Sequence, residues 1–167
     1  MPRVHDDPTT RVCAKPTEAD LRLIRLWRWG DPTAPLRASL DRGEIVAFPT
    51  ESSYALGVDP WNPAGVEAIY RAKGRPREKA LPVVIADVSD LARLGVALDL
   101  PILAPVLKRL SEIWPAPLTA ILPLAGPPSE HPAAAGGLTT LAVRVPAHER
   151  LRELLRAVGP MTATSAN

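Results

Sequence analysis

Short apolar runs that end at a proline or glycine alternate with helical patterns along most of this chain. The helical patterns cover residues 18–29, 34–42, 62–73, 87–95, 106–113 and 151–158. The apolar runs cover residues 44–48, 81–86, 118–124 and 139–146, and Met161–Asn167 begins a last strand or a turn. Buried strands that alternate with helices are typical of layered α/β folds. The pattern therefore predicts an α/β fold, with a mixed sheet as one option.

The helix expected over residues 62–73 has signals at both ends. Asn62 is suited to cap its N-terminus and Gly74 to end it. Its apolar stripe consists of Val66, Ile69 and Tyr70. Lys73 continues that stripe in the last turn, so its ammonium group is expected to point past the helix end, toward the next loop.

Length, apolar content and charge exclude several classes of protein. The 167 residues suit one domain, and an apolar content of 46% is typical of a globular chain. The formal net charge is only +2, which does not favour a dedicated nucleic-acid binder. We expect residues 1–18 to form a flexible N-terminal arm and residues 19–167 to form the domain.

Nothing in the sequence indicates export or membrane insertion. The single cysteine, Cys13, excludes an intramolecular disulfide bond and fits a reducing compartment. No run approaches the roughly 18 apolar residues of a membrane span, and the N-terminus lacks a signal-peptide core. We therefore expect a cytoplasmic protein without a membrane partner.

Positive charge is concentrated in one short segment after the helix over residues 62–73. Between Arg71 and Lys79 there are five basic residues and one acid, Glu78. Lysine and arginine beside a glycine could hold phosphate groups, although the P-loop pattern is absent. The alternative is a solvated run of charge.

Polar side chains elsewhere offer further ligand contacts. Hydroxyls and a carboxylate follow the strand that ends at Pro49, and Thr164–Asn167 adds hydroxyls and an amide. Either run could bind a ligand or form a polar turn. Arg144, inside an apolar strand, faces either a ligand anion or solvent. The three histidines are expected to be solvated, with no catalytic-triad or metal-ligand spacing.

Taken together and in order, five segments resemble the YrdC-like family, the threonylcarbamoyl-AMP synthases. They are GEIVAFPTESSYALGVD, IYRAKGRPREKALPVVI, WPAPLTAILP, LAVRVPAH and GPMTATSAN. The resemblance extends over residues 36–167 and implies a twisted open mixed sheet with flanking helices and a concave basic cavity. It also implies an enzyme that condenses L-threonine, bicarbonate and ATP, with Mg²⁺, into threonylcarbamoyl-AMP and pyrophosphate. A partner complex would then transfer the threonylcarbamoyl group to tRNA.

The resemblance also assigns roles to individual residues. It implies that Lys73 and Arg75 are catalytic. The ATP contacts that it implies are Arg75, Lys79, Thr140, Ser165 and Asn167. The threonine contacts that it implies are Ser52, Arg144 and the backbone of Ala163. No metal-binding residue is implied.

The chain departs from the family pattern in several places. Val84 stands where relatives often have a threonine-contacting histidine, and Ala80 and Ala116 replace a usual proline and glycine. Relatives also continue past the last motif into further cavity-lining strands, so a C-terminally short domain with weak activity is expected. Three alternatives stay open: an RNA-binding module, a carbamoyl-adenylate domain of a larger maturation enzyme, and an inactive remnant or fragment.

Overall fold

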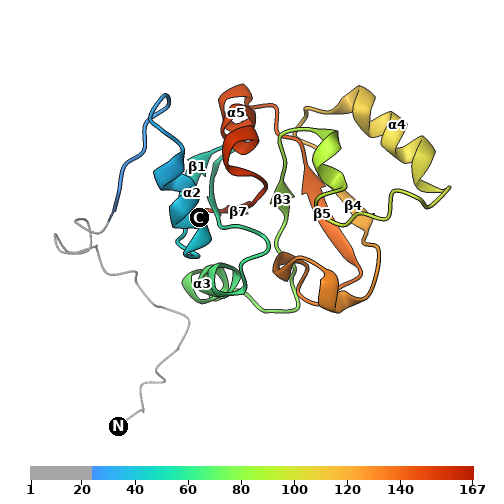
Figure 1. The fold of residues 1–167 in the computed structure, drawn as a ribbon, viewed down its shortest axis with the longest axis horizontal. Coiled ribbons are helices and arrows are strands. Elements are labelled where there is room, and N and C mark those ends of the chain that lie inside the picture. Colours follow the sequence, from blue (N-terminus) through green and yellow to red (C-terminus); the bar gives the residue numbers. More distant parts are fainter. Residues whose placement is uncertain (1–23) are drawn as a thin grey trace, which may run out of the picture. The chain divides into compact units, whose positions relative to one another are not determined.

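The protein was analysed as a computed structural model that describes residues 24–167. Residues 32–167 form one compact unit, shown in Figure 1. Its α-helices are α2 (Ala34–Asp41), α3 (Pro63–Lys73), α4 (Leu103–Ile113) and α5 (Glu149–Val158). Its strands are β1 (Val46–Pro49), β2 (Tyr54–Gly57), β3 (Val83–Val84), β4 (Ala120–Pro123), β5 (Thr140–Arg144), β6 (Met161–Thr162) and β7 (Thr164–Ser165). Three short 3₁₀ helices cover Val88–Leu91, Pro128–Glu130 and Ala133–Ala135.

The strands form two sheets. The first has the order β1-β2-β7 and is antiparallel throughout. The second has the order β4-β5-β3-β6 and is mixed, because β3 and β5 run parallel while the other pairs are antiparallel. The prediction of a mixed α/β fold is therefore confirmed, although the strands divide between two sheets rather than one.

The chain passes from one sheet to the other at a single residue near its C-terminal end. β6 belongs to the four-stranded sheet, β7 to the three-stranded sheet, and only Ala163 separates them. In Figure 1 this red segment runs from beneath α5 to the C-terminus beside β7. The amide of Thr162 donates to the Val58 carbonyl at 2.9 Å and that of Ala163 to the Pro82 carbonyl at 2.7 Å. These bonds hold the two sheets against each other.

Helix α3 forms as its sequence predicts. The Asn62 side chain accepts a hydrogen bond from the amide of Gly65 at 3.0 Å, and Gly74 ends the helix in the left-handed conformation. Ile69 is fully buried in the core that α3 shares with the four-stranded sheet. Burial of this apolar stripe fixes the orientation of α3, and so the position of Lys73 at its C-terminal end.

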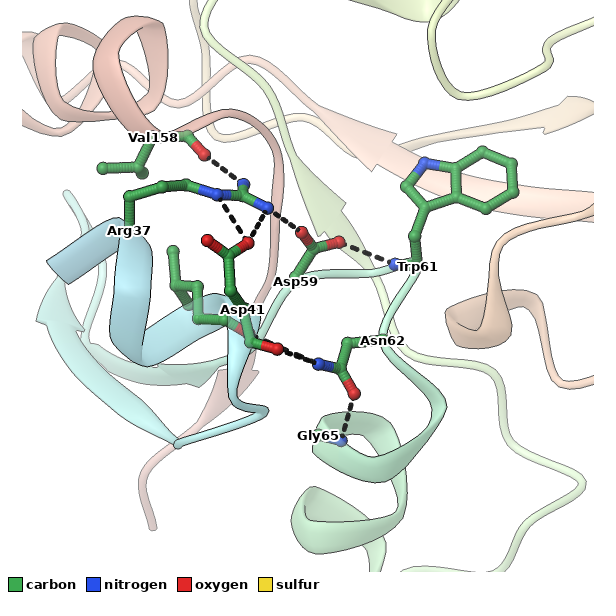
Figure 2. Close-up of polar contacts among 8 residues, drawn as sticks. Arg37, Asp41, Asp59, Trp61, Asn62, Gly65 and Val158 are labelled. Carbon is green, nitrogen blue, oxygen red and sulfur yellow. Dashed lines mark hydrogen bonds and ion pairs between the residues drawn. The ribbon is translucent and has the colours of Figure 1, made fainter. Parts of the chain in front are cut away.

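A network around Arg37 ties three parts of the unit together, as Figure 2 shows. Its guanidinium group donates to the Asp41 carboxylate at 2.5 and 2.9 Å, to Asp59 at 2.7 Å and to the Val158 carbonyl at 2.7 Å. The second Asp59 oxygen accepts the Trp61 amide at 2.9 Å. The hydrogen bond with Asp41 raises the pKa of Arg37 above its ordinary value, so this cation is permanent. We call these residues the Arg37 network.

Several expectations about secondary structure were wrong. The helix predicted over residues 18–29 is absent from its described part, Ile24–Trp29, and the remainder lies outside the described residues. Ile24 and Leu26 are 60% and 78% exposed, and a helix that buries no apolar face has little to stabilise it. Strand β2 was missed because it is short and follows a polar turn. The helix predicted over 87–95 is only a 3₁₀ turn.

The histidines were expected to be solvated, but those within residues 24–167 bond backbone groups instead. His148 caps α5, since its Nδ1 accepts the amide of Leu151 at 3.1 Å. Both ring nitrogens of His131 lie 3.0–3.2 Å from backbone carbonyl oxygens of the loop that surrounds it. Both side chains therefore support local backbone structure. His5 lies outside the described residues.

No helix within residues 24–167 combines the length and the apolar content needed to cross a membrane.

Candidate functional site

A cavity of about 180 Å³ lies where the two sheets meet. The turn after β1 contributes Thr50 and Ser52, and β7 contributes Ser165. The four-stranded sheet contributes Val84 and Arg144, and the link between the sheets contributes Ala163. We call this space the inter-sheet cavity. The turn after β1 and strand β7 supply a wall rich in hydroxyl groups, and the four-stranded sheet supplies a wall that combines apolar side chains with a guanidinium group.

The hydroxyl wall is held rigid by Thr50. The amides of Ser52 and Ser53 donate to the Thr50 hydroxyl at 3.2 and 3.1 Å, and that hydroxyl donates to the Ser53 carbonyl at 2.7 Å. The Ser52 hydroxyl lies 3.2 Å from that of Thr50 and is exposed. The polar run after β1 was expected either to form a turn or to bind a ligand. It does form a turn, and that turn places Ser52 in the cavity lining.

Arg144 faces the cavity rather than bulk solvent. Along β5 the buried positions alternate, so Leu141 and Val143 enter the core while Arg144 lies on the other face. Its side chain is 16% exposed. Within residues 24–167 its only ion pair or hydrogen bond is a 3.3 Å approach of Nη1 to Oε1 of Glu51. Glu51 was missed as its partner, although it was the one carboxylate in the polar run after β1.

The C-terminal segment joins α3 to the cavity. The ammonium group of Lys73 donates to the Ser165 carbonyl at 2.8 Å and also to the backbone oxygen of Asn167. Lys73 was expected to point past the helix end toward the next loop, but its ammonium group bonds the C-terminal segment instead. The amide of Ala163 is occupied by Pro82, so its carbonyl is the backbone group available to a ligand there.

The basic loop after α3 is folded onto itself. The guanidinium group of Arg75 donates to the carbonyls of Lys79 and Ala80 at 3.1 and 3.0 Å. The phenol of Tyr70 donates to the same Lys79 carbonyl at 3.0 Å, and burial raises the pKa of Tyr70, which keeps it protonated. Arg77 pairs with Glu67 at 2.6 Å. Arg75 thus stabilises the loop from within, whereas Arg71, Arg77 and Lys79 are exposed.

The structure brings part of the predicted site together. The residues that line the inter-sheet cavity are Ser52, Arg144, Ala163 and Ser165. Lys73 and Asn167 are joined to that set by the hydrogen bonds of Lys73. Arg75, Lys79 and Thr140 are not in the lining, although Thr140 shares with Arg144 the face of β5 that points away from the core. The basic character predicted for the cavity stays a prediction, since Arg144 is the one cation in this lining.

Comparison with protein families decides the assignment. The family model Sua5_yciO_yrdC, described as "Telomere recombination", matches residues 38–167. The chain belongs to this family. The match includes both sheets and every residue of the inter-sheet cavity.

Two curated relatives of this family member carry the same enzyme name. A "Threonylcarbamoyl-AMP synthase" of Bacillus subtilis is 44% identical over 140 residues, which are 82% of this chain and 39% of the relative. A protein of the same name from Laribacter hongkongensis is 41% identical over 131 residues, covering 78% of this chain and 68% of the relative. The chain therefore spans between about two fifths and two thirds of the length of these relatives.

A solved structure supports the fold assignment. The crystal structure of P. abyssi Sua5 complexed with L-threonine has a TM-score of 0.66 and 37% sequence identity. The alignment covers 80% of this chain and 38% of that one.

Proposed function

We propose that this chain forms threonylcarbamoyl-AMP and pyrophosphate from L-threonine, bicarbonate and ATP. The observation that carries the proposal is the inter-sheet cavity, which places Ser52, Arg144 and Ala163 around one small space beside Ser165. These are the positions at which family resemblance assigns threonine and ATP contacts. The names of the relatives and the threonine complex of P. abyssi Sua5 support the same reaction.

Threonine recognition follows from the chemistry of the cavity walls. Arg144 keeps most of its five N–H donors available, and a guanidinium group binds a carboxylate in a planar, two-pronged manner. The exposed hydroxyl of Ser52 can bond a polar group of the substrate. Pro82 and Val84 make part of the lining apolar, which suits the methyl group of threonine. The cavity thus distinguishes a small amino acid with both polar and apolar parts.

The phosphate groups of ATP are assigned to the basic loop and the C-terminal segment. Lys73 uses two of its three N–H donors on backbone oxygens and keeps one for a phosphate. Arg75 and Lys79 add two cations, with Thr140, Ser165 and Asn167 as polar contacts. As the carbamate oxygen attacks the α-phosphate, pyrophosphate leaves and negative charge builds on it, which these cations stabilise. The carbamate is itself the nucleophile, so no protein nucleophile is needed.

Mg²⁺ is expected to accompany ATP. Among the described residues, no group of three or more histidine, cysteine, aspartate or glutamate side chains could hold a metal ion. The described residues therefore do not fit a metal held by the protein alone. The product, an acyl adenylate, would be consumed by a complex that transfers its threonylcarbamoyl group to tRNA.

The test is a product assay with single omissions. The chain is incubated with ATP, L-threonine and bicarbonate, and threonylcarbamoyl-AMP is detected by mass spectrometry, which registers even slow turnover. We expect product and pyrophosphate only when all three substrates are present. Pyrophosphate release that does not depend on threonine or bicarbonate would contradict the proposal. A chain that binds neither ATP nor threonine would contradict it as well.

A further inference from the structure

The ion pair between Glu51 and Arg144 is the only one within residues 24–167 that connects the two sheets. Glu51 lies at the tip of the turn between β1 and β2, whereas Arg144 ends β5 in the other sheet. The chain neighbours of Glu51, Thr50 and Ser52, both line the inter-sheet cavity, as Arg144 does. Glu51 itself is not in the lining, but its carboxylate approaches the guanidinium group of the cavity and so lies beside it.

The side chains of this pair are partly shielded from water, although Glu51 as a whole residue is exposed at the tip of its turn, and neither side chain has its hydrogen-bonding capacity filled. Their side chains are 16% and 18% exposed. Within the described residues, the Glu51 carboxylate has the 3.3 Å approach to Arg144 as its sole polar contact, and no backbone amide donates to it. Partly shielded charges with unused capacity need further hydrogen-bond partners, which water or a ligand can supply. A ligand that brings both an anion and a cation would satisfy each side.

An α-amino acid has this composition. Its ammonium and carboxylate groups are attached to one carbon, so the residues that bind them must stand side by side, as Glu51 and Arg144 do. A guanidinium group alone would accept any carboxylate. A carboxylate beside it adds attraction only for ligands that also carry a positive charge, and repels those that do not.

We propose that Glu51 binds the α-ammonium group of threonine and so makes the inter-sheet cavity selective for a zwitterionic amino acid over a simple carboxylic acid. This inference rests on the proposed function, because it assumes threonine in the cavity with its carboxylate on Arg144. It assigns to Glu51 a role in specificity that is separate from the handling of ATP.

The test compares two ligands that differ only in the ammonium group, L-threonine and (R)-3-hydroxybutyrate. Their affinities are measured by ligand-detected NMR for the wild type, Glu51→Gln and Glu51→Asp. Glu112→Gln is the matched control, because Glu112 also pairs with an arginine, Arg109 at 2.9 Å, but lies on α4 and outside the cavity lining. Circular dichroism checks the fold of each variant.

Glu51→Gln is expected to weaken threonine binding by about 10-fold or more, the usual effect of losing a charged hydrogen bond. Binding of (R)-3-hydroxybutyrate should stay the same or become tighter, because a repelling charge is removed. Glu51→Asp should bind threonine with intermediate affinity, and the control should match the wild type.

Other outcomes overturn the inference. Equal weakening of both ligands means that Glu51 only positions Arg144, and equal strengthening means that it only competes for Arg144. An unchanged threonine affinity in Glu51→Gln defeats this inference alone, whereas a wild type that binds neither ligand defeats the proposed function too. If Glu51→Gln does not fold, the wild type still decides: equal affinity for the two ligands contradicts selection by Glu51.

Discussion

Two arginines, Arg37 and Arg144, each border a hollow of similar size, yet their surroundings differ. The hollow at Arg37 measures about 210 Å³ and is also lined by Asp59 and Trp61, whereas the inter-sheet cavity measures about 180 Å³. Arg37 donates to two carboxylates and a backbone carbonyl at 2.5–2.9 Å. Arg144 has one approach at 3.3 Å within residues 24–167. The two hollows therefore do not differ much in volume. They differ in how many guanidinium donors are already used in internal hydrogen bonds.

The comparison favours a structural role for Arg37 and agrees with the ligand-binding role proposed for Arg144. The partners of Arg37 come from α2, from the segment after β2 and from the end of α5, so its bonds hold those parts together. A ligand there would have to break them. Arg144 is the more buried of the two side chains, 16% against 40% exposed, and keeps its donors open. Open donors leave the Arg144 guanidinium group able to bind water or a ligand without breaking internal bonds.

The largest effect on threonine binding is expected from substitution of Arg144, whose donors are largely unused. Arg144→Leu should raise the dissociation constant of L-threonine by about 100-fold or more, because the carboxylate loses its charged, two-pronged partner. The fold should persist, since Arg144 has a single internal contact within the described residues. Calorimetric titration with threonine and circular dichroism measure the two properties. A variant that binds threonine like the wild type would contradict the assignment of the inter-sheet cavity as the threonine site.

Substitution of Arg37, whose donors are mostly in use, should lower stability and leave threonine binding unchanged. Arg37→Leu is expected to lower the free energy of unfolding by about 2 kcal/mol, a value kept modest because the side chain is partly exposed. Asp59, whose side chain is 14% exposed, would lose one of its donors, and the Val158 carbonyl would lose its bond to Arg37. Threonine affinity should not change. Urea denaturation provides the stability, and a stable variant with impaired threonine binding would reverse the comparison.

Arg75 tests an intermediate case, because its guanidinium group bonds two carbonyls of its own loop. Arg75→Ala should weaken ATP binding by about 1.5 kcal/mol, through loss of a phosphate contact. Arg77→Ala is the matched control: it removes an exposed cation from the same loop, paired with Glu67. Titration with ATP compares the two variants. Equal affinities in both would mean that Arg75 contributes no more than general positive charge.

The smallest effect is expected from adding a donor to the apolar wall. Val84→His should tighten threonine binding by about three-fold, the gain typical of one added neutral hydrogen bond. Val84 is 1% exposed, so the larger ring should also lower the melting temperature. Parallel threonine titration and thermal unfolding check both effects. Weaker binding in a folded variant would show that the wall needs to remain apolar.

The sequence predicted much of this architecture because its signals are local. Asn62 and Gly74 define the ends of α3, and the apolar runs locate β4 and β5 to within a few residues. The roles of the two arginines could not be predicted in this way. Arg37 is 121 residues from Val158 along the chain, and Glu51 reaches Arg144 from a different sheet. Such pairs depend on how the sheets are assembled at Ala163, which no local pattern encodes. The missed strand β2 likewise depends on its pairing with β1 and β7.

The central claim is that the inter-sheet cavity, not the hollow at Arg37, receives the amino acid. A crystal structure of the chain grown with L-threonine tests this directly. The account predicts threonine beside Ser52, with its carboxylate bonded to Arg144 and its ammonium group near Glu51, while the Arg37 network keeps every bond. Threonine bound beside Arg37 and Trp61, with Arg144 still facing Glu51 alone, would contradict it.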